Sequence, residues 1–278
     1  MSNCPSDLRR LYREGRVIPF IGAGASMSVS WGPESKPKRG PSWREMVDQA
    51  VRILGIEKPD LLRIRGTELQ ILEYFQIMKG GWAEISNWLS IELSSATDDD
   101  IVRSPIYRQL AELDRCHVFY TTNYDNFIER ALRYTGREAH VVSSERNISH
   151  DRTKTEVVKF HGDFSSPDKM VFSESHFLDR MALESPMDLK FRADMLGRAV
   201  LFVGYGFGDP NVNYIFYLVN KILSALPDSY TGRRAYIILS DPSEFERRLF
   251  NARNIEVIAV DSTDRSANVA NVLQSMRN

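Results

Sequence analysis

Short, almost continuous apolar runs recur along the chain and are separated by segments whose apolar residues have helical spacing. Runs of this kind are typical of strands buried on both faces of a parallel sheet. Their alternation with helical segments predicts an α/β fold, with a Rossmann-like, mostly parallel, doubly wound sheet. We expect about six strands, at residues 17–21, 117–121, 157–160, 199–203, 235–239 and 256–260.

The stretch from residue 42 to residue 114 has no comparably clear strand. Its segments LQILEYFQIM and WAEISNWLSIEL carry apolar residues at helical spacing, which predicts an inserted helical layer packed on the sheet. Residues 28–41 are rich in Ser, Gly and Pro and predict a loop, and the polar residues 137–156 predict irregular structure. Pro19 would shorten or bulge the first strand. We expect one domain spanning residues 1–278.

Composition narrows the class of protein. Hydrophobic residues make up 42% of the 278 residues and charged residues 26%, which is ordinary for a globular protein with a core. A formal net charge of −1 gives no electrostatic case for direct nucleic-acid binding. Two cysteines cannot form a zinc tetrad and suggest no disulfide framework. With no apolar run of membrane-spanning length and no signal-peptide pattern, we expect a cytoplasmic protein without membrane contact.

Glycine or small polar residues follow each of the first four predicted strands. The segments are GAGAS (22–26), TTNYD (121–125), HGD (161–163) and GYGFGDPN (204–211). In a doubly wound sheet, ligands bind outside the carboxyl ends of the strands near the topological switch point. The four segments therefore predict a binding site at one edge of the sheet.

Each segment also has a simpler interpretation. Gly22 and Gly24 could let main-chain N–H groups approach a pyrophosphate, with Ser26 as a further donor, or could form only a tight turn. Asp125 could simply cap the helix that follows, whereas Asn123 lies too early to cap it easily.

Two further positions have a structural alternative. His161 could be a buried histidine hydrogen-bonded to the main chain. Asp209 could be an N-cap with Pro210 at the first helical position.

Taken in order, GAGAS, TTNYD, FHGD and GYGFGDPN resemble the motif series of the sirtuin superfamily, over roughly residues 17–215. They are especially similar to the sirtuin-like NADases of bacterial anti-phage defence, whose signatures read much like FIGAGAS, TTNYD and KxHG. Sirtuins bind NAD+ on a Rossmann-like sheet and break the bond between nicotinamide and ribose. The resemblance therefore implies NAD as the substrate, with no metal.

The resemblance assigns roles position by position. Asn123 and Asp125 match the pair beside the nicotinamide ribose, and His161 matches the histidine that contacts the ribose hydroxyls and serves as base. We expect Asn123 to orient the attacking water, His161 to polarise a hydroxyl or take a proton, and Asp125 to offset positive charge. The residues expected to bind the substrate are Gly22, Ala23, Gly24, Ser26, Thr122, Gly204, Tyr205, Gly206 and Asp209.

The chain also departs from the deacylating sirtuins. Those enzymes insert a module held by four cysteines, whereas no cysteine follows His161 here. The first loop continues as MSVSWGPES, without the Pro-Asp-Phe-Arg of the deacylases. The expected activity is therefore an NAD+ glycohydrolase that releases nicotinamide and ADP-ribose. The alternatives are an NAD-dependent protein deacylase and a non-catalytic module that binds NAD or ADP-ribose and drives oligomerisation.

A constitutive NADase would kill its host, so the resemblance implies a gated effector of abortive infection. We expect gating by homo-oligomer assembly, or by a regulatory partner such as an Argonaute-like protein, a ring-forming ATPase or a sensor. A sensor would lie in a separate protein or in a further segment. The helical layer at 42–114 is the candidate contact surface.

Overall fold

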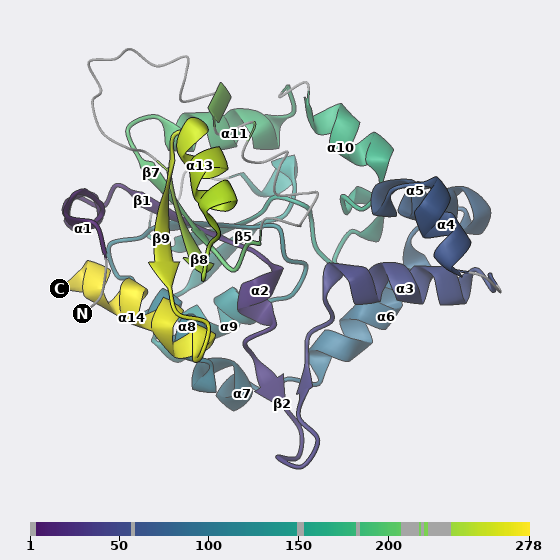
Figure 1. The fold of residues 1–278 in the computed structure, drawn as a ribbon, viewed down its shortest axis with the longest axis horizontal. Coiled ribbons are helices and arrows are strands. Elements are labelled where there is room, and N and C mark those ends of the chain that lie inside the picture. The colour runs from purple at the N-terminus through teal and green to yellow at the C-terminus, as the bar shows by residue number, and fades with distance from the viewer. Residues whose placement is uncertain are drawn as a thin grey trace.

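A parallel sheet forms the centre of the computed structural model, which describes residues 4–56, 59–148, 153–181, 184–206, 217, 220–221 and 235–278. Among these residues, seven strands pair in the order β5-β6-β4-β1-β7-β8-β9 (Figure 1). Helices cover both faces of the sheet, which confirms the predicted doubly wound α/β fold. The strands are β1 (Val17–Ile21), β4 (Val118–Thr121), β5 (Ala139–Val142), β6 (Thr155–Lys159), β7 (Ala199–Val203), β8 (Ala235–Ser240) and β9 (Ile255–Val260).

The prediction of irregular structure over residues 137–156 was wrong at both ends of that stretch. Strand β5 lies within it, and β6 begins at Thr155, two residues earlier than expected. β5 pairs only with β6, at the edge of the sheet, and of its four residues only Val142 is buried. An edge strand that buries one side chain has no continuous apolar run, so the hydrophobic pattern did not reveal it.

Pro19 neither shortens nor bulges the first strand. The pairing of β1 with β7 is continuous and matches Pro19 with Leu201. The Gly22 N–H donates toward β7, so the alternation along the strand turns the nitrogen of Pro19 toward β4. Pairing with β4 begins only at Phe20. The missing N–H of Pro19 therefore falls on the β4 side, where the pairing is short, and leaves the pairing with β7 intact.

Two apolar layers bury the two faces of the sheet. One face packs against α1 (Ser6–Arg13), α8 (Pro105–Ala111), α9 (Phe127–Tyr134) and α14 (Arg265–Arg277). The other packs against α11 (Pro186–Met195) and α13 (Glu244–Ala252). Because helices cover both faces, all five residues of β1 and of β7 are buried, as expected from their uninterrupted apolar sequence.

The predicted insertion is helical throughout its described part. It contains α3 (Trp43–Ile53), α4 (Pro59–Arg65), α5 (Glu68–Lys79), α6 (Ala83–Ser94), α7 (Asp98–Arg103) and α8. Reciprocal capping boxes fix the starts of α3, α5 and α7, with Ser42, Thr67 and Thr97 as their N-caps.

Of these helices, α7, α8 and the end of α6 at Leu93 join the core on the sheet, so the predicted packing was wrong for α3 and α5. α3, α5 and α6 build a second core with Met170 and Phe172, beside α10 (Glu174–Met181), and lie to one side of the sheet (Figure 1). Apolar helical spacing predicts a buried face, but it does not say what that face is buried against.

The segment predicted as a loop after the first motif is partly ordered. It follows the short α2 (Ala23–Ser26) and forms a hairpin of β2 (Ser30–Trp31) and β3 (Lys38–Arg39). Trp31 is buried and packs edge-on against Phe127, with ring centroids 6.4 Å apart. One aromatic side chain therefore anchors a segment whose Ser, Gly and Pro content indicated only a loop.

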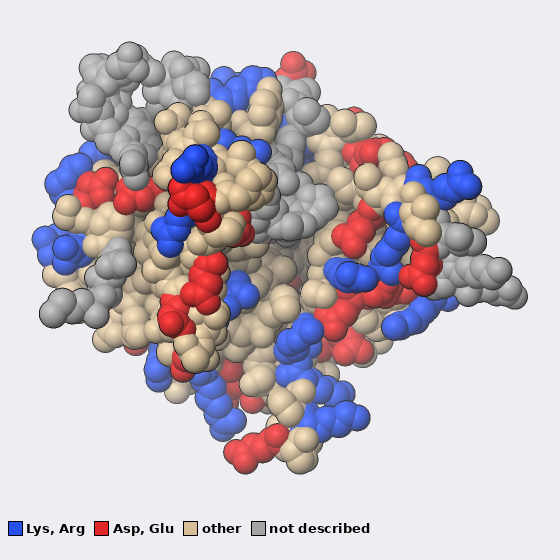
Figure 2. Space-filling view, viewed as in Figure 1, with Lys and Arg blue, Asp and Glu red and all other residues tan. Residues whose placement is uncertain are grey.

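The surface and the remaining elements add little that bears on the site. Two short 3-10 turns, η1 (Glu145–Asn147) and η2 (Pro167–Lys169), complete the described structure. On the face shown in Figure 2, basic and acidic side chains are interspersed. Within the described ranges, no helix is both long enough and apolar enough to cross a membrane.

Candidate active site

The carboxyl ends of β1, β4, β6 and β7 are adjacent, so the four sequence motifs meet at one edge of the sheet. Ile21 is in register with Thr121 on one side and with Val203 on the other. Thr121 is in turn in register with Lys159. This is the switch point of the strand order, where α/β proteins bind ligands. Asp209 and the rest of the fourth motif after Gly206 lie outside the described residues.

A pocket opens at this edge and brings together six of the predicted site residues. It contains about 620 Å³ of empty space, its open mouth included. The rest of the lining comes from residues 40–43, Tyr124, Leu93 and two residues of the second core, Met46 and Leu89. The predicted residues that line the pocket are Ala23, Ser26, Thr122, Asn123, Asp125 and His161.

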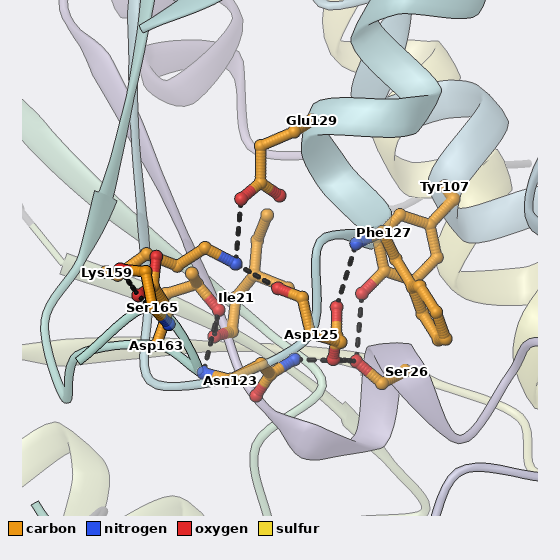
Figure 3. A network of polar contacts seen from close by, with 11 residues as sticks. Ile21, Ser26, Tyr107, Asn123, Asp125, Phe127, Glu129, Lys159, Asp163 and Ser165 are labelled. Carbon is orange, nitrogen blue, oxygen red and sulfur yellow. Dashed lines mark hydrogen bonds and ion pairs between the residues drawn. The ribbon is translucent and has the colours of Figure 1, made fainter. Parts of the chain in front are cut away.

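Asn123 presents one free oxygen at this site. Its Nδ2 donates to the Gly22 carbonyl at 3.0 Å and to Ser26 Oγ at 2.8 Å (Figure 3). A carbonyl only accepts hydrogen bonds, so the atom facing Gly22 must be the amide nitrogen, which fixes the orientation of the side chain. Asn123 Oδ1 has no hydrogen-bond partner among the described residues. This acceptor is therefore available to a water molecule or a ligand.

Asp125 combines both interpretations of its sequence position. Its Oδ1 accepts the N–H of Phe127, the first residue of α9, at 3.0 Å. Its Oδ2 accepts the hydroxyl proton of Ser26 at 2.6 Å. The carboxylate thus satisfies a donor at the helix start and also belongs to the polar network of the pocket.

Tyr107 of α8 is a member of this network that the sequence did not reveal. Its hydroxyl lies 2.9 Å from Ser26 Oγ. Ser26 has one hydroxyl proton and gives it to Asp125, so Tyr107 must be the donor in its own bond to Ser26. Burial, together with the nearby Asp125, raises the pKa of Tyr107 well above its ordinary value, which keeps the phenol protonated.

His161 is buried with an unused ring nitrogen. The residue is 1% exposed, and its Nε2 has no hydrogen-bond partner among the described residues. At Nε2, this ring therefore does not form the main-chain hydrogen bond that was its structural alternative. Phe177 packs edge-on against the ring, with centroids 5.2 Å apart. Burial, reinforced by the positive charge of Arg180, lowers the pKa of His161 well below its ordinary value. The ring is therefore neutral at physiological pH.

The predicted glycines contact one another rather than the pocket. Gly22 N–H donates to Val203 O at 2.8 Å, and Gly24 N–H donates to Gly204 O at 2.8 Å. Gly204 has a φ of +78°, and a Cβ added there would lie 2.3 Å from the Ala25 nitrogen. Both N–H groups are already used within the protein, so these glycines allow close contact between the loops after β1 and β7.

Tyr205 belongs to the same packed region and is buried. Its hydroxyl donates to Ile21 O at 3.2 Å and lies 3.0 Å from Thr122 Oγ1. Its ring packs on Phe20 and Phe202 in the core. Gly206 is different, because a Cβ added there would meet no atom of the described residues within 4 Å.

The sequence model of the SIR2-like domain family matches residues 117–258, just over half of the chain. This match includes the TTNYD turn, His161 and the end of β7. The chain belongs to the SIR2-like family.

Curated relatives of this SIR2-like chain include proteins named for defence and for NAD(+) hydrolysis. Defense-associated sirtuin 2 of Bacillus subtilis is 26% identical over 87% of this chain and 22% of its own length. NAD(+) hydrolase ThsA of Bacillus cereus is 24% identical over 98% of this chain and 56% of its own length. NAD(+) hydrolase ThsA of Acinetobacter baumannii is 27% identical over 73% of this chain and 39% of its own length. The chain spans between about a fifth and just over half of these relatives.

A buried ion pair adjoins the pocket of this SIR2-like chain and was also missed from the sequence. Lys159 Nζ lies 2.8 Å from Glu129 Oε1, and both side chains are buried. Lys159 also donates to the main-chain carbonyl of Asp125. The signal available in the sequence was the lysine of KFHG (159–162), which matches the KxHG signature of the similar NADases. Its partner in α9 could not be read from that signal.

Metal ligands are not grouped in the described part of this SIR2-like chain. No set of three or more His, Cys, Asp or Glu side chains there is arranged to hold a metal ion. The polar side chains that line the pocket provide an amide, an imidazole, a carboxylate and several hydroxyl groups. Such a set can orient water, accept a hydrogen bond and offset positive charge.

Proposed function

We propose that this SIR2-like chain hydrolyses NAD+ to nicotinamide and ADP-ribose. The observation that carries the proposal is the buried Nε2 of His161, which has no partner among the described residues and lies at the pocket that Asn123 also lines. A buried polar atom without a partner is costly, so its presence at a pocket favours a role in binding or chemistry. The relatives named NAD(+) hydrolase support the same reaction.

The reaction needs few groups, because nicotinamide leaves as a neutral molecule from a cationic glycoside. No general acid is required for the leaving group, while the oxocarbenium-like transition state needs a placed water and electrostatic support. Asn123 Oδ1 would accept a hydrogen bond from the attacking water. The neutral His161 ring would accept a hydrogen bond from a ribose hydroxyl. The Asp125 carboxylate would offset the positive charge of the transition state.

The other predicted residues take different parts in this proposal. Ala23 and Thr122 line the pocket and would contact the substrate. Ser26 would hold Asn123 and Asp125 in place rather than donate to a phosphate, because its proton is given to Asp125. Gly22, Gly24, Gly204 and Tyr205 would shape the loops that border the pocket. Gly206 would leave space for the substrate, and Asp209 remains a predicted contact.

We further propose that the activity serves in anti-phage defence, through NAD+ depletion and abortive infection in the cytoplasm. The relative named Defense-associated sirtuin 2 supports a defence role. Gating by homo-oligomer assembly or by a regulatory partner is part of this proposal and derives from the family resemblance. The reason is that ungated NAD+ hydrolysis would deplete the host itself.

The first test measures nicotinamide release from NAD+ by the purified protein over a range of protein concentrations. Asn123→Ala and His161→Ala should each lower the rate at least about 100-fold, since each removes one group that acts on the transition state. Residues of the same types outside the pocket lining provide controls, so Asn251→Ala, at an exposed position, and His140→Ala, at a partly exposed one, should leave the rate unchanged. A rate per molecule that rises with protein concentration would support assembly-dependent gating.

Each contrary outcome identifies a different function. Wild-type turnover in both active-site variants would refute the proposed roles of Asn123 and His161. Nicotinamide release only in the presence of an acylated peptide would indicate a deacylase. Tight NAD+ binding without turnover at any concentration, with candidate activators present, would indicate a binding module.

A further inference from the structure

One buried lysine connects three segments beside the pocket. Lys159 is the last residue of β6, and its ammonium group contacts both Glu129 in α9 and the main-chain carbonyl of Asp125 (Figure 3). The side chains of Lys159 and Glu129 are 1% and 8% exposed. The end of a strand, the TTNYD turn and the first turn of a helix are thus joined through one positive charge.

This pair is a poor choice if its only purpose is stability. Removing two charges from water costs free energy that their attraction often fails to recover, and apolar residues of similar size often serve as well. Glu129 Oε2 has no hydrogen-bond partner among the described residues, so the pair is also incompletely satisfied. Burial raises the pKa of Glu129, although Lys159 opposes that effect. The distinctive feature of the arrangement is the bond from Lys159 to the Asp125 carbonyl.

Along the chain, the Asp125 carbonyl stands just after the side chains of Asn123 and Asp125 and just before helix α9. At the start of the turn, Asn123 N–H donates to Thr121 Oγ1 at 3.0 Å. At its end, the Asp125 side chain receives the Phe127 N–H. Lys159 holds the peptide group between these two anchors. Its bond therefore limits how far the turn can rotate, and with it the direction in which Asn123 points.

We propose that Lys159 is a positioning residue for the reaction, and that Glu129 holds Lys159 in place. This inference rests on the hydrolase function proposed above. Lys159 does not line the pocket that contains Asn123 and His161. It lines a neighbouring pocket that shares Asp125 with the first, and its link to Asn123 therefore runs through the turn. A displacement of about 1 Å in a catalytic group can lower a rate about 100-fold, which sets the size of the expected effect.

The test compares Lys159→Met with the double variant Lys159→Met/Glu129→Met. Lys159→Met leaves the Glu129 carboxylate buried without its partner, so both the melting temperature and kcat should fall. The double variant removes both charges, so its melting temperature should return toward the wild-type value. Its kcat should stay about 100-fold low with KM within about threefold of wild type, since only orientation is lost.

Lys190 of α11 provides a matched control, because its ammonium group bonds to the same strand, β6. It bonds to Glu156 near the start of β6 at 2.7 Å and to Asp194, away from the turn. Lys190→Met should leave kcat unchanged. A double variant at Lys159 and Glu129 that recovers kcat together with its melting temperature would overturn the proposal, because the pair would then act only through stability.

Amide hydrogen exchange tests the same inference without turnover. In the double variant, exchange over residues 121–127 should be about tenfold faster than in wild type, with β8 unchanged. Equal exchange over the turn would overturn the positioning role. If wild-type protein releases no nicotinamide at any concentration, with candidate activators present, the proposed hydrolase function fails, and hydrogen exchange still decides whether Lys159 holds the turn. The two failures are therefore distinguishable.

Discussion

The two sides of the switch point use their small and polar residues for different purposes. On the side of β1 and β7, the glycine loops are in close contact, and the N–H groups of Gly22 and Gly24 donate to the β7 strand end and the loop after it. On the side of β4 and β6, Asn123 and His161 each keep an atom without a partner. The comparison teaches that a motif at a strand end marks the location of a site but not the role of each residue. Glycines there can serve packing, while an amide and an imidazole serve the ligand.

The largest expected effect comes from a substitution on the side of β1 and β7, where the glycine loops are in close contact. Gly204→Ala should lower the free energy of unfolding by about 3 kcal/mol or more, because it combines a left-handed backbone with a Cβ placed 2.3 Å from the Ala25 nitrogen. Chemical denaturation of the purified variant measures this loss.

Gly206 is the matched control two residues further along the chain. A Cβ there meets no atom of the described residues within 4 Å, and its φ is outside the left-handed region, so Gly206→Ala should change stability by less than about 0.5 kcal/mol. Similar losses in both variants would show that general rigidity of the loop, rather than the contact between the loops, is what matters. A drop in NAD+ turnover in Gly206→Ala alone would indicate that this glycine leaves room for the substrate.

The second prediction concerns His161, which lies on the side of β4 and β6. The folded protein lowers the pKa of His161 below the value of about 6.5 expected in the unfolded chain. Between these two values the unfolded state binds more protons than the folded state. Stability should therefore be complete above pH 6.5 and should fall as the pH decreases, by up to about 1.4 kcal/mol per pH unit.

The measurement is the free energy of unfolding between pH 7.5 and pH 5, for wild type and His161→Gln. The variant should lose the part of the slope that begins near pH 6.5. His140→Gln is the control, because that ring is partly exposed and bonds to the Asn147 carbonyl. Identical slopes in wild type and His161→Gln would mean that His161 titrates alike in both states, and that its burial has no effect on protonation.

The position of the site could be predicted from the sequence because it depends on a regular feature of the fold. Apolar runs identify buried strands, and the carboxyl ends of parallel strands necessarily lie at one edge. The residues just after the runs, such as Asn123 and His161, were therefore predicted to lie together, and both line the pocket. The edge strand β5 was missed because it buries only Val142, which leaves no apolar run to detect.

The network around those residues could not be predicted, because its members come from distant parts of the chain. Tyr107 bonds to Ser26 across 81 residues, and its position in an amphipathic helix indicated only packing. Lys159 and Glu129 lie in different elements, and nothing in the sequence around either residue indicates that they pair. Likewise, the sequence indicated that Gly204 favours a turn, but not that its carbonyl accepts from Gly24. Contacts of this kind depend on how helices and loops are placed, which local patterns do not encode.

The smallest expected effect tests whether the inserted helices support the polar side of the site. Tyr107→Phe removes one hydroxyl from α8 and leaves Ser26 bonded to Asn123 and Asp125. Stability should fall by about 1 kcal/mol, the usual net value of one hydrogen bond, and kcat should fall only a few-fold. Tyr134→Phe, at an exposed position of α9, should change neither quantity. A loss of kcat as large as that of Asn123→Ala would contradict this ranking, because it would show that α8 sets the geometry of the site and does not merely support it.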